Sequence, residues 1–216
     1  MKDFAEKVWL GGHIYTVDRF FSTATALACS GDRITAVGSD SEMEALIGPD
    51  TEVVRLQGAV VLPGLIVLAS MQATHAPNSA SMALRRIGAE RASRAYAGGL
   101  VLETLGMVAS ESDAPVAQPD QLDGIHSAVT RTNGVLSPAG GFFPQNAFTR
   151  KQAIQSYTIW GAYAQFAEHD KGSLELGKLA DFVILDVDPM TVEADDLLKI
   201  QVVNTIVGGE TVYQKD

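Results

Sequence analysis

The chain has 216 residues, a formal net charge of −10 and 46% hydrophobic residues, a composition typical of an acidic globular protein with one or two domains. Because phosphate binding needs a basic surface, this charge argues against a nucleic acid as partner. No apolar run reaches the roughly 18 residues that a membrane-spanning helix needs, so we expect no membrane partner either.

The cysteine count and the N-terminal residues predict the compartment. Cys29 is the single cysteine of the sequence, so it cannot form an internal disulfide. The residues Met1-Lys2-Asp3-Phe4 lack the pattern of a signal peptide. We therefore expect a reducing, cytoplasmic setting.

Short β-like runs with turn signals between them make up the first 62 residues. They lie at 8–10, 13–17, 25–29, 33–38, 52–56 and 59–62. Ser30-Gly31-Asp32 separates two of these runs, which predicts a β-hairpin. A short helix is expected at 41–47, with Ser41 as its N-cap and Glu44 in the capping-box position.

The middle of the chain, from 63 to 169, has an α/β pattern. Leu65 to Met71 is a continuous apolar run, which is typical of a strand buried on both faces of a parallel sheet. Met107 to Ser110 is predicted to be a second short buried strand. Thr149 is the predicted N-cap of a helix, with Gln152 in the capping-box position. Helices are expected at 89–105, 122–131 and 149–166.

The last stretch returns to β-rich runs, at 181–185, 202–207 and 211–213. Chain ends commonly meet in one domain. We therefore expect residues 1–62 and 170–216 to form a composite β-sandwich domain, with the α/β segment 63–169 inserted between them. The predicted fold class is mixed, α+β with an α/β part.

Several motifs in these segments resemble one enzyme family. They are Gly12 to Asp18, Asp32 to Gly38, Val61 to Ile66, Ser70 to Ala76, Ser112 to Val116 and Lys171 to Asp181. Together they resemble the metal-dependent amidohydrolases, in particular the branch that contains N-substituted formamide deformylases. The strongest of these motifs is Gly177-Lys178-Leu179-Ala180-Asp181 with the β-rich run after it.

This resemblance implies a (β/α)8 barrel that carries one or two metals, flanked by a small β-sandwich made from both chain ends. The first barrel strand of the family normally ends in a His-x-His pair of metal ligands, and this sequence contains no His-x-His. The segment from Val67 onward instead resembles the seventh barrel strand, and Ser110 to Asp113 resembles the eighth. A complete barrel needs about 200 to 250 residues, and the segment 63–169 is roughly half that long. The resemblance therefore implies a truncated barrel remnant.

Two residues match functional positions of the family. Asp113 matches the aspartate after the eighth strand, which makes it the catalytic candidate and a candidate metal ligand. His75 matches a histidine of the seventh-strand loop, which suggests substrate contact, with metal binding as a second role. The simpler alternatives stay open: Asp113 as a loop carboxylate or a helix N-cap, and His75 as an ordinary loop residue. His126 and His169 are interpreted as surface or helix-end residues.

Metal-assisted hydrolysis needs a cation held by about three or more protein ligands, with one position open for water. Only Asp113 is carried over as an established ligand, so the divalent metal of the family, zinc, is expected to be absent or weakly bound. Two functions stay open. The first is a metal-dependent hydrolase of amide-type C–N bonds in a small-molecule substrate, with an incomplete metal site. The second is a non-catalytic remnant of such an enzyme. Because the apolar strands have lost most of their neighbours, we expect a homo-oligomer in either case.

Overall fold

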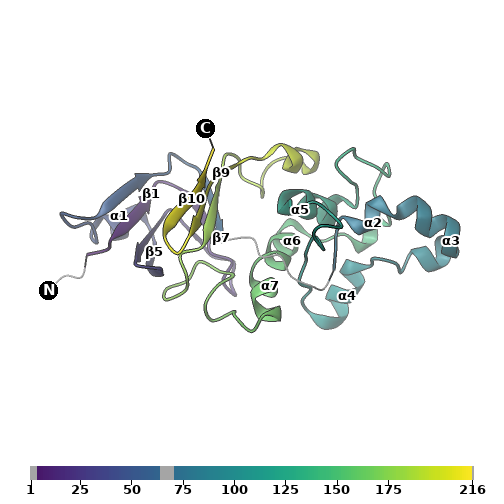
Figure 1. The fold of residues 1–216 in the computed structure, drawn as a ribbon, viewed down its shortest axis with the longest axis horizontal. Coiled ribbons are helices and arrows are strands. Elements are labelled where there is room, and N and C mark those ends of the chain that lie inside the picture. The colour runs from purple at the N-terminus through teal and green to yellow at the C-terminus, as the bar shows by residue number, and fades with distance from the viewer. Residues whose placement is uncertain (1–3, 64–70, 216) are drawn as a thin grey trace. The chain divides into compact units, whose positions relative to one another are not determined.

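The computed structural model describes residues 4–63 and 71–215 (Figure 1). The chain divides into two compact units. The first unit comprises Met1–Leu65, Phe166–Asp188 and Gln201–Asp216, and the second comprises Ile66–Gln165 and Pro189–Ile200. The strand expected at Leu65–Met71 lies, except for Met71, outside the described residues. The described part of the chain contains no helix that is both long enough and apolar enough to span a membrane.

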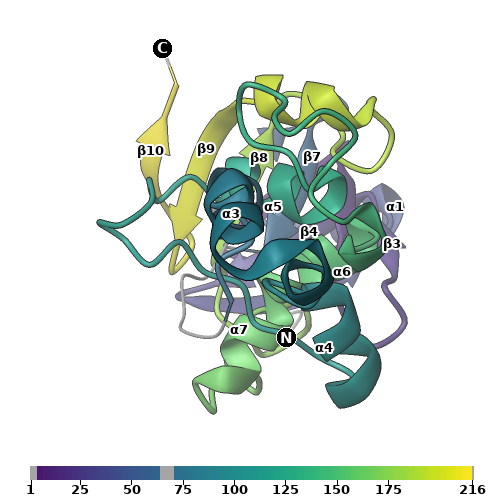
Figure 2. The ribbon, with the colours of Figure 1, turned by 90° about the vertical axis from the view of Figure 1, so that its right-hand side faces the viewer.

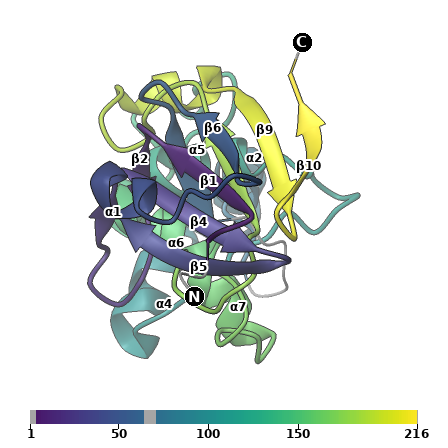
Figure 3. The same ribbon diagram turned by 90° about the vertical axis from the view of Figure 1, so that its left-hand side faces the viewer.

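A four-stranded sheet in the order β5-β4-β1-β6 forms one part of the first unit (Figure 3). Its strands are β1 (Lys7–Leu10), β4 (Ala26–Ser30), β5 (Arg33–Gly38) and β6 (Glu52–Arg55). β4 and β5 pair antiparallel, with Leu27 opposite Val37, which confirms the hairpin predicted around Gly31. β1 pairs antiparallel with β4 and parallel with β6.

A six-stranded sheet in the order β10-β9-β8-β7-β2-β3 forms the other part of the first unit. Its strands are β2 (His13–Tyr15), β3 (Thr23–Ala24), β7 (Val60–Pro63), β8 (Phe182–Leu185), β9 (Val202–Val207) and β10 (Glu210–Gln214). β7 and β8 pair antiparallel, with Val61 opposite Ile184. Strands from both halves of the sequence therefore share one sheet.

The alternation of side chains along β1 shows where the core of the first unit lies. Successive residues of a strand point to opposite faces of the sheet. Trp9 is buried in a cluster that contains residues of both sheets, Phe182 and Ile206 among them. Its neighbours Val8 and Leu10 are buried in a second cluster, with Met43 of helix α1 (Asp40–Glu44). β1 is thus covered on both faces.

Helix α1 begins two residues earlier than predicted. Ser39, not Ser41, is the N-cap, and its side chain accepts a hydrogen bond from the backbone N–H of Glu42. The Glu42 carboxylate in turn accepts from the backbone N–H of Ser39 at 2.7 Å. The capping box is therefore formed by the pair Ser39 and Glu42, because the chain turns into the helix directly after β5 ends at Gly38.

The second unit is built of short helices (Figure 2). They are α2 (His75–Asn78), α3 (Ala80–Ala92), α4 (Gly98–Leu105), α5 (Gln121–Thr130), η1 (Pro144–Asn146), α6 (Arg150–Ser156), α7 (Ile159–Ala164) and η2 (Ala194–Lys199). The single helix predicted at 89–105 is wrong, because the chain leaves α3 after Ala92 and enters α4 only at Gly98. Between them Tyr96 has a φ of +53°, which a continuous right-handed helix does not allow.

The helix predicted at 149–166 is also divided in two, although its start is confirmed. Thr149 caps α6, and Gln152 completes the capping box. The interruption falls at Thr158, whose backbone is non-helical. The Thr158 hydroxyl donates to the carbonyl oxygen of Ile154 at 2.7 Å, a local bond that competes with regular helix geometry.

Candidate functional site

Two segments of the second unit meet in an isolated parallel bridge. The Met71 N–H donates to the Ala109 carbonyl oxygen at 3.2 Å, and the Glu111 N–H donates to the Met71 carbonyl oxygen at 3.1 Å. Met71 and Ser110 thereby form a parallel bridge. Among the described residues, the strand predicted at Met107–Ser110 is reduced to this bridge. Because the bridge is parallel, the residues that follow it, 72–75 and 111–113, leave it in the same direction. We call the place where these two segments leave the bridge the edge.

Glu111 places a carboxylate in the buried part of this edge, with only 5% of its surface exposed. One carboxylate oxygen accepts from the side-chain amide of Gln72, on the neighbouring segment. The other accepts from the backbone N–H of Asp113. Glu111 was not among the residues predicted from the sequence. Its place directly after an apolar run, where barrel enzymes carry their functional residues, is a usable signal.

Asp113 lies on an exposed turn after this bridge. Its φ of +54° is in the left-handed region, which aspartate enters more readily than most residues. The N-cap of α5 is Asp120, whose carboxylate accepts from the N–H groups of Leu122 and Asp123 at 3.0 and 3.3 Å. The alternative that Asp113 caps this helix is therefore wrong, and Asp113 is a loop carboxylate whose side chain is exposed to solvent.

His75 is the first residue of α2 and is half-buried. The residue before it, Thr74, and the residue before Asp113, Ser112, are both buried. In the described part of the chain, neither of these two hydroxyls has a hydrogen-bond partner. Buried hydroxyls normally have one. The hydrogen bonding of this edge is therefore left incomplete by the described residues.

The side chains at this edge do not form a metal site with three or four protein ligands. Within residues 4–63 and 71–215, no three His, Cys, Asp or Glu side chains are grouped so that they could hold a metal ion. Asp113 and His75 belong to no such group, and the carboxylate of Glu111 is already bonded to two donors. A stable site needs three or four ligands, so the described side chains do not fit a resident metal by themselves.

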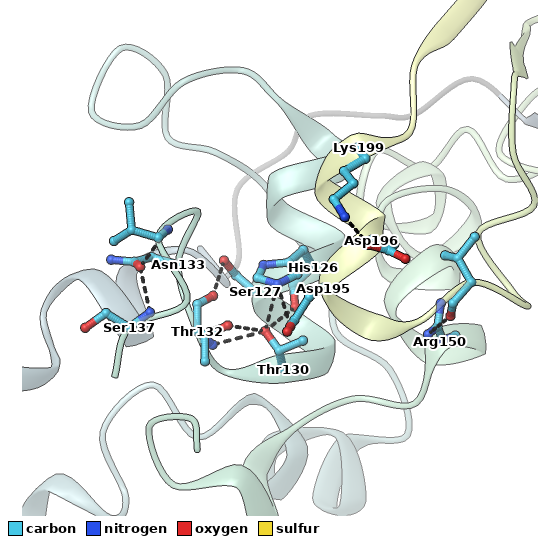
Figure 4. A network of polar contacts seen from close by, with 12 residues as sticks. His126, Ser127, Thr130, Thr132, Asn133, Ser137, Arg150, Asp195, Asp196 and Lys199 are labelled. Atoms are coloured by element: carbon cyan, nitrogen blue, oxygen red, sulfur yellow. Dashed lines mark hydrogen bonds and ion pairs between the residues drawn. The ribbon is translucent and has the colours of Figure 1, made fainter. Parts of the chain in front are cut away.

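His126, which the sequence analysis interpreted as a surface or helix-end residue, is fully buried on α5 (Figure 4). Its Nε2 lies 3.8 Å from Oδ1 of Asp195 in η2 and 3.4 Å from the Thr130 hydroxyl. Burial lowers the pKa of the His126 imidazole, and the nearby carboxylates of Asp123 and Asp195 oppose this shift. The signal for its burial was its place one helical turn after the apolar residue Leu122.

His169, which was also interpreted as a surface or helix-end residue, is exposed, with 91% of its side chain accessible. Its Nε2 lies 3.6 Å from a carboxylate oxygen of Glu168. The interpretation of this residue as a surface histidine is confirmed.

Comparison with known proteins identifies the class of protein. The model of the amidohydrolase family matches residues 62–213, so the chain belongs to the amidohydrolase family. It is similar to a solved structure described as an uncharacterized metal-dependent hydrolase from Pyrococcus furiosus, with a TM-score of 0.67 and 10% sequence identity. That alignment covers 86% of this chain and 100% of the other, and it shows that the two folds are alike.

Two curated relatives have a higher sequence identity to the chain than this structure has. The chain is 34% identical over 150 residues to the protein LONG AFTER FAR-RED 3 of Arabidopsis thaliana. This alignment covers 69% of this chain and 25% of the relative. The chain is 32% identical over 108 residues to the N-substituted formamide deformylase of Arthrobacter pascens. This alignment covers 50% of this chain and 19% of the relative. The family resemblance of the sequence motifs is thereby confirmed. The chain spans a quarter or less of the length of these relatives.

Proposed function

We propose that this chain acts in the hydrolysis of an amide-type C–N bond of a small molecule, with a metal site that is incomplete without further residues. The observation that carries the proposal is the parallel bridge between Met71 and Ser110. It holds the segments of His75 and Asp113 at one edge, as the ends of adjacent barrel strands would be held. Functional residues of (β/α)8 enzymes gather at that edge.

The architecture is part of the same proposal. We assign the two sheets of the first unit to the composite β-sandwich expected from residues 1–62 and 170–216. This assignment is supported by the pairing of β7 with β8 and by the core that both sheets share. We assign the second unit to a truncated remnant of the barrel, expected at 63–169. It is supported by the Met71–Ser110 bridge with helices after both of its segments.

Asp113 is the catalytic residue of the proposal. Its exposed carboxylate is free to accept a proton from an attacking water, a role that needs contact with solvent and substrate. His75, at the neighbouring segment end, is the proposed substrate contact, and both residues are candidate ligands of a weakly held divalent ion such as zinc. Because the described donors do not complete a metal site, the proposal takes the missing ligands from a partner chain.

A second candidate function is a non-catalytic remnant that folds and assembles. It is favoured by the absence of a three-ligand group from residues 4–63 and 71–215. It is also favoured by the exposed apolar side chains of Met82, Leu84 and Ile87 on α3, which a partner could cover. In this form the chain is a homo-oligomer without hydrolytic activity.

A hydrolysis assay separates the two candidates. The purified chain is incubated with N-substituted formamides and simple amides, with and without added zinc, and its metal content is measured by elemental analysis. The proposal expects metal-stimulated hydrolysis that is lost in Asp113→Asn and kept in Asp50→Asn, a control that changes an exposed carboxylate of the first unit. A folded chain without activity under every condition would contradict the proposal and favour the remnant.

A further inference from the structure

Glu111 connects the two segment ends of the candidate site. Its carboxylate bonds the Gln72 side chain on one segment and the Asp113 backbone N–H on the other. The two bonds use different oxygens, Oε1 for Gln72 and Oε2 for Asp113. Both ends are therefore tied to one side chain.

The physical chemistry of this group makes it a strong connection. A buried carboxylate is costly unless donors satisfy it, so its two bonds are difficult to break one at a time. Hydrogen bonds to a charged acceptor are about twice as strong as neutral ones. Glu111 is itself fixed by its backbone N–H, which donates to Met71. The acceptor for the Asp113 N–H is thus held at a defined place on the paired segments.

The turn at Asp113 depends on this acceptor. A φ of +54° is unfavourable for a residue with a side chain, and such a conformation persists where its surroundings hold it. The bond from the Asp113 N–H to Glu111 is one such restraint, and the bond from the Val116 N–H to the Asp113 carbonyl oxygen, at 2.7 Å, is another. Together they decide the direction in which the Asp113 side chain leaves the chain.

We propose that Glu111 is a positioning residue for Asp113: it holds the Asp113 backbone in the turn that presents the Asp113 carboxylate at the edge. Gln72 keeps the Glu111 carboxylate in place. Glu111 is not the reacting group, because it is buried and both of its oxygens are engaged. The inference rests on the proposed function for the importance of Asp113, but the contact itself can be tested without any activity.

Hydrogen exchange of the Asp113 amide, followed by NMR, tests the contact. In Glu111→Ala the Asp113 N–H loses its acceptor, and its exchange is expected to accelerate about tenfold, which corresponds to one lost hydrogen bond. Glu111→Gln keeps an oxygen acceptor of the same length and should restore most of the protection. Glu42→Ala removes a comparable carboxylate-to-N–H bond in the first unit, and it should leave the Asp113 amide unchanged.

Unchanged Asp113 exchange in Glu111→Ala would overturn the proposal. If Glu111→Ala does not fold, Gln72→Ala replaces it, since it frees the carboxylate from its other donor. Gln72→Ala is expected to accelerate Asp113 exchange by a smaller factor, and no acceleration would again overturn the proposal.

A kinetic arm distinguishes positioning from general stability. If the wild-type chain hydrolyses a substrate, Glu111→Ala should lower kcat at least about tenfold while KM changes little. The double variant Glu111→Ala with Asp113→Asn should be no slower than Asp113→Asn alone, because Glu111 acts through Asp113. Losses that multiply would refute positioning. If the wild type is inactive, the proposed function fails, while the exchange experiment still decides the role of Glu111.

Discussion

The indole of Trp9 and the phenyl ring of Phe182 meet edge to face, with ring centroids 5.1 Å apart and ring planes at 85°. Trp9 belongs to the four-stranded sheet and Phe182 to the six-stranded sheet, and both side chains are buried. Edge-to-face aromatic pairs contribute about 0.5 to 1.5 kcal/mol beyond the burial of their surface. This contact is therefore a direct link between the two sheets of the first unit.

Phe182→Ala is expected to lower the free energy of unfolding by about 3 to 5 kcal/mol, because it removes a fully buried ring and leaves a cavity beside Trp9. Chemical denaturation followed by tryptophan fluorescence measures the change. Phe20→Ala is the matched control, since the Phe20 side chain is exposed, and it should alter stability by less than about 0.5 kcal/mol. Equal effects of the two variants would contradict the assignment of Phe182 to the core.

Arg131→Lys is expected to destabilise the second unit by about 1 to 3 kcal/mol. The buried Arg131 guanidinium donates from Nε to the Phe142 carbonyl oxygen at 2.9 Å and from Nη1 to the Tyr96 carbonyl oxygen at 2.8 Å. A lysine keeps the charge, but its single amino group cannot reproduce the planar geometry of these two hydrogen bonds. Denaturant titration of Arg131→Lys beside Arg85→Lys, a change on the exposed face of α3, checks the expectation. Comparable midpoints for the two variants would argue against it.

The buried His126 predicts a pH dependence of stability. Burial lowers its pKa in the folded chain, whereas in the unfolded chain it is about 6.5. Between these two values the unfolded state binds more protons, so stability falls as the pH drops below about 6.5. His126→Gln should flatten this dependence, and His169→Gln, at an exposed position, should not. Thermal unfolding at a series of pH values from 7 to 5 provides the measurement, and identical slopes for wild type and His126→Gln would disprove the role.

Association of the chain with itself is our fourth prediction. Met82, Leu84 and Ile87 expose apolar surface on α3, and such surface favours burial against a partner. Analytical ultracentrifugation at micromolar concentration should give a species heavier than the 22.9 kDa of one chain. Leu84→Glu with Ile87→Glu should shift the equilibrium toward the monomer, while Glu90→Gln on the same helix should not. A wild-type chain that sediments as a monomer would rule the prediction out.

Features that depend on neighbouring residues could be predicted from the sequence. The hairpin around Gly31 and the capping box of Thr149 and Gln152 are both local, and both are present. The break at Thr158 was missed because its cause is a side-chain bond to Ile154, which leaves no trace in the apolar pattern. The N-cap was predicted at Ser41, although the end of the preceding strand at Gly38 was predicted correctly. Ser39 with Glu42 and Ser41 with Glu44 have the same capping-box spacing, so the sequence pattern alone does not separate them.

Features that depend on distant residues could be predicted only in part. The family motifs pointed to Asp113 and His75, but not to the side chains around them. The role of Glu111 depends on its pairing with the segment of Gln72, and that register is not visible in either segment alone. The spacing of His126 from Leu122 indicates that it shares the apolar face of α5, but not which element covers that face. Part of the cover is η2, which follows His126 by about 70 residues and whose packing on α5 no local pattern predicts.

The pairing of β7 with β8 has a consequence for the length of the segment between them. Pro63 lies opposite Phe182, so the sheet closes a loop that contains the residues from 64 to 181. The entropy of closing a flexible loop grows only with the logarithm of its length, by about 0.6 kcal/mol for each doubling. A folded insertion whose own ends lie close together adds even less. The sheet can therefore close around a long or a short insertion at nearly the same cost, which allows the inserted part to change in length while the β-rich unit remains folded.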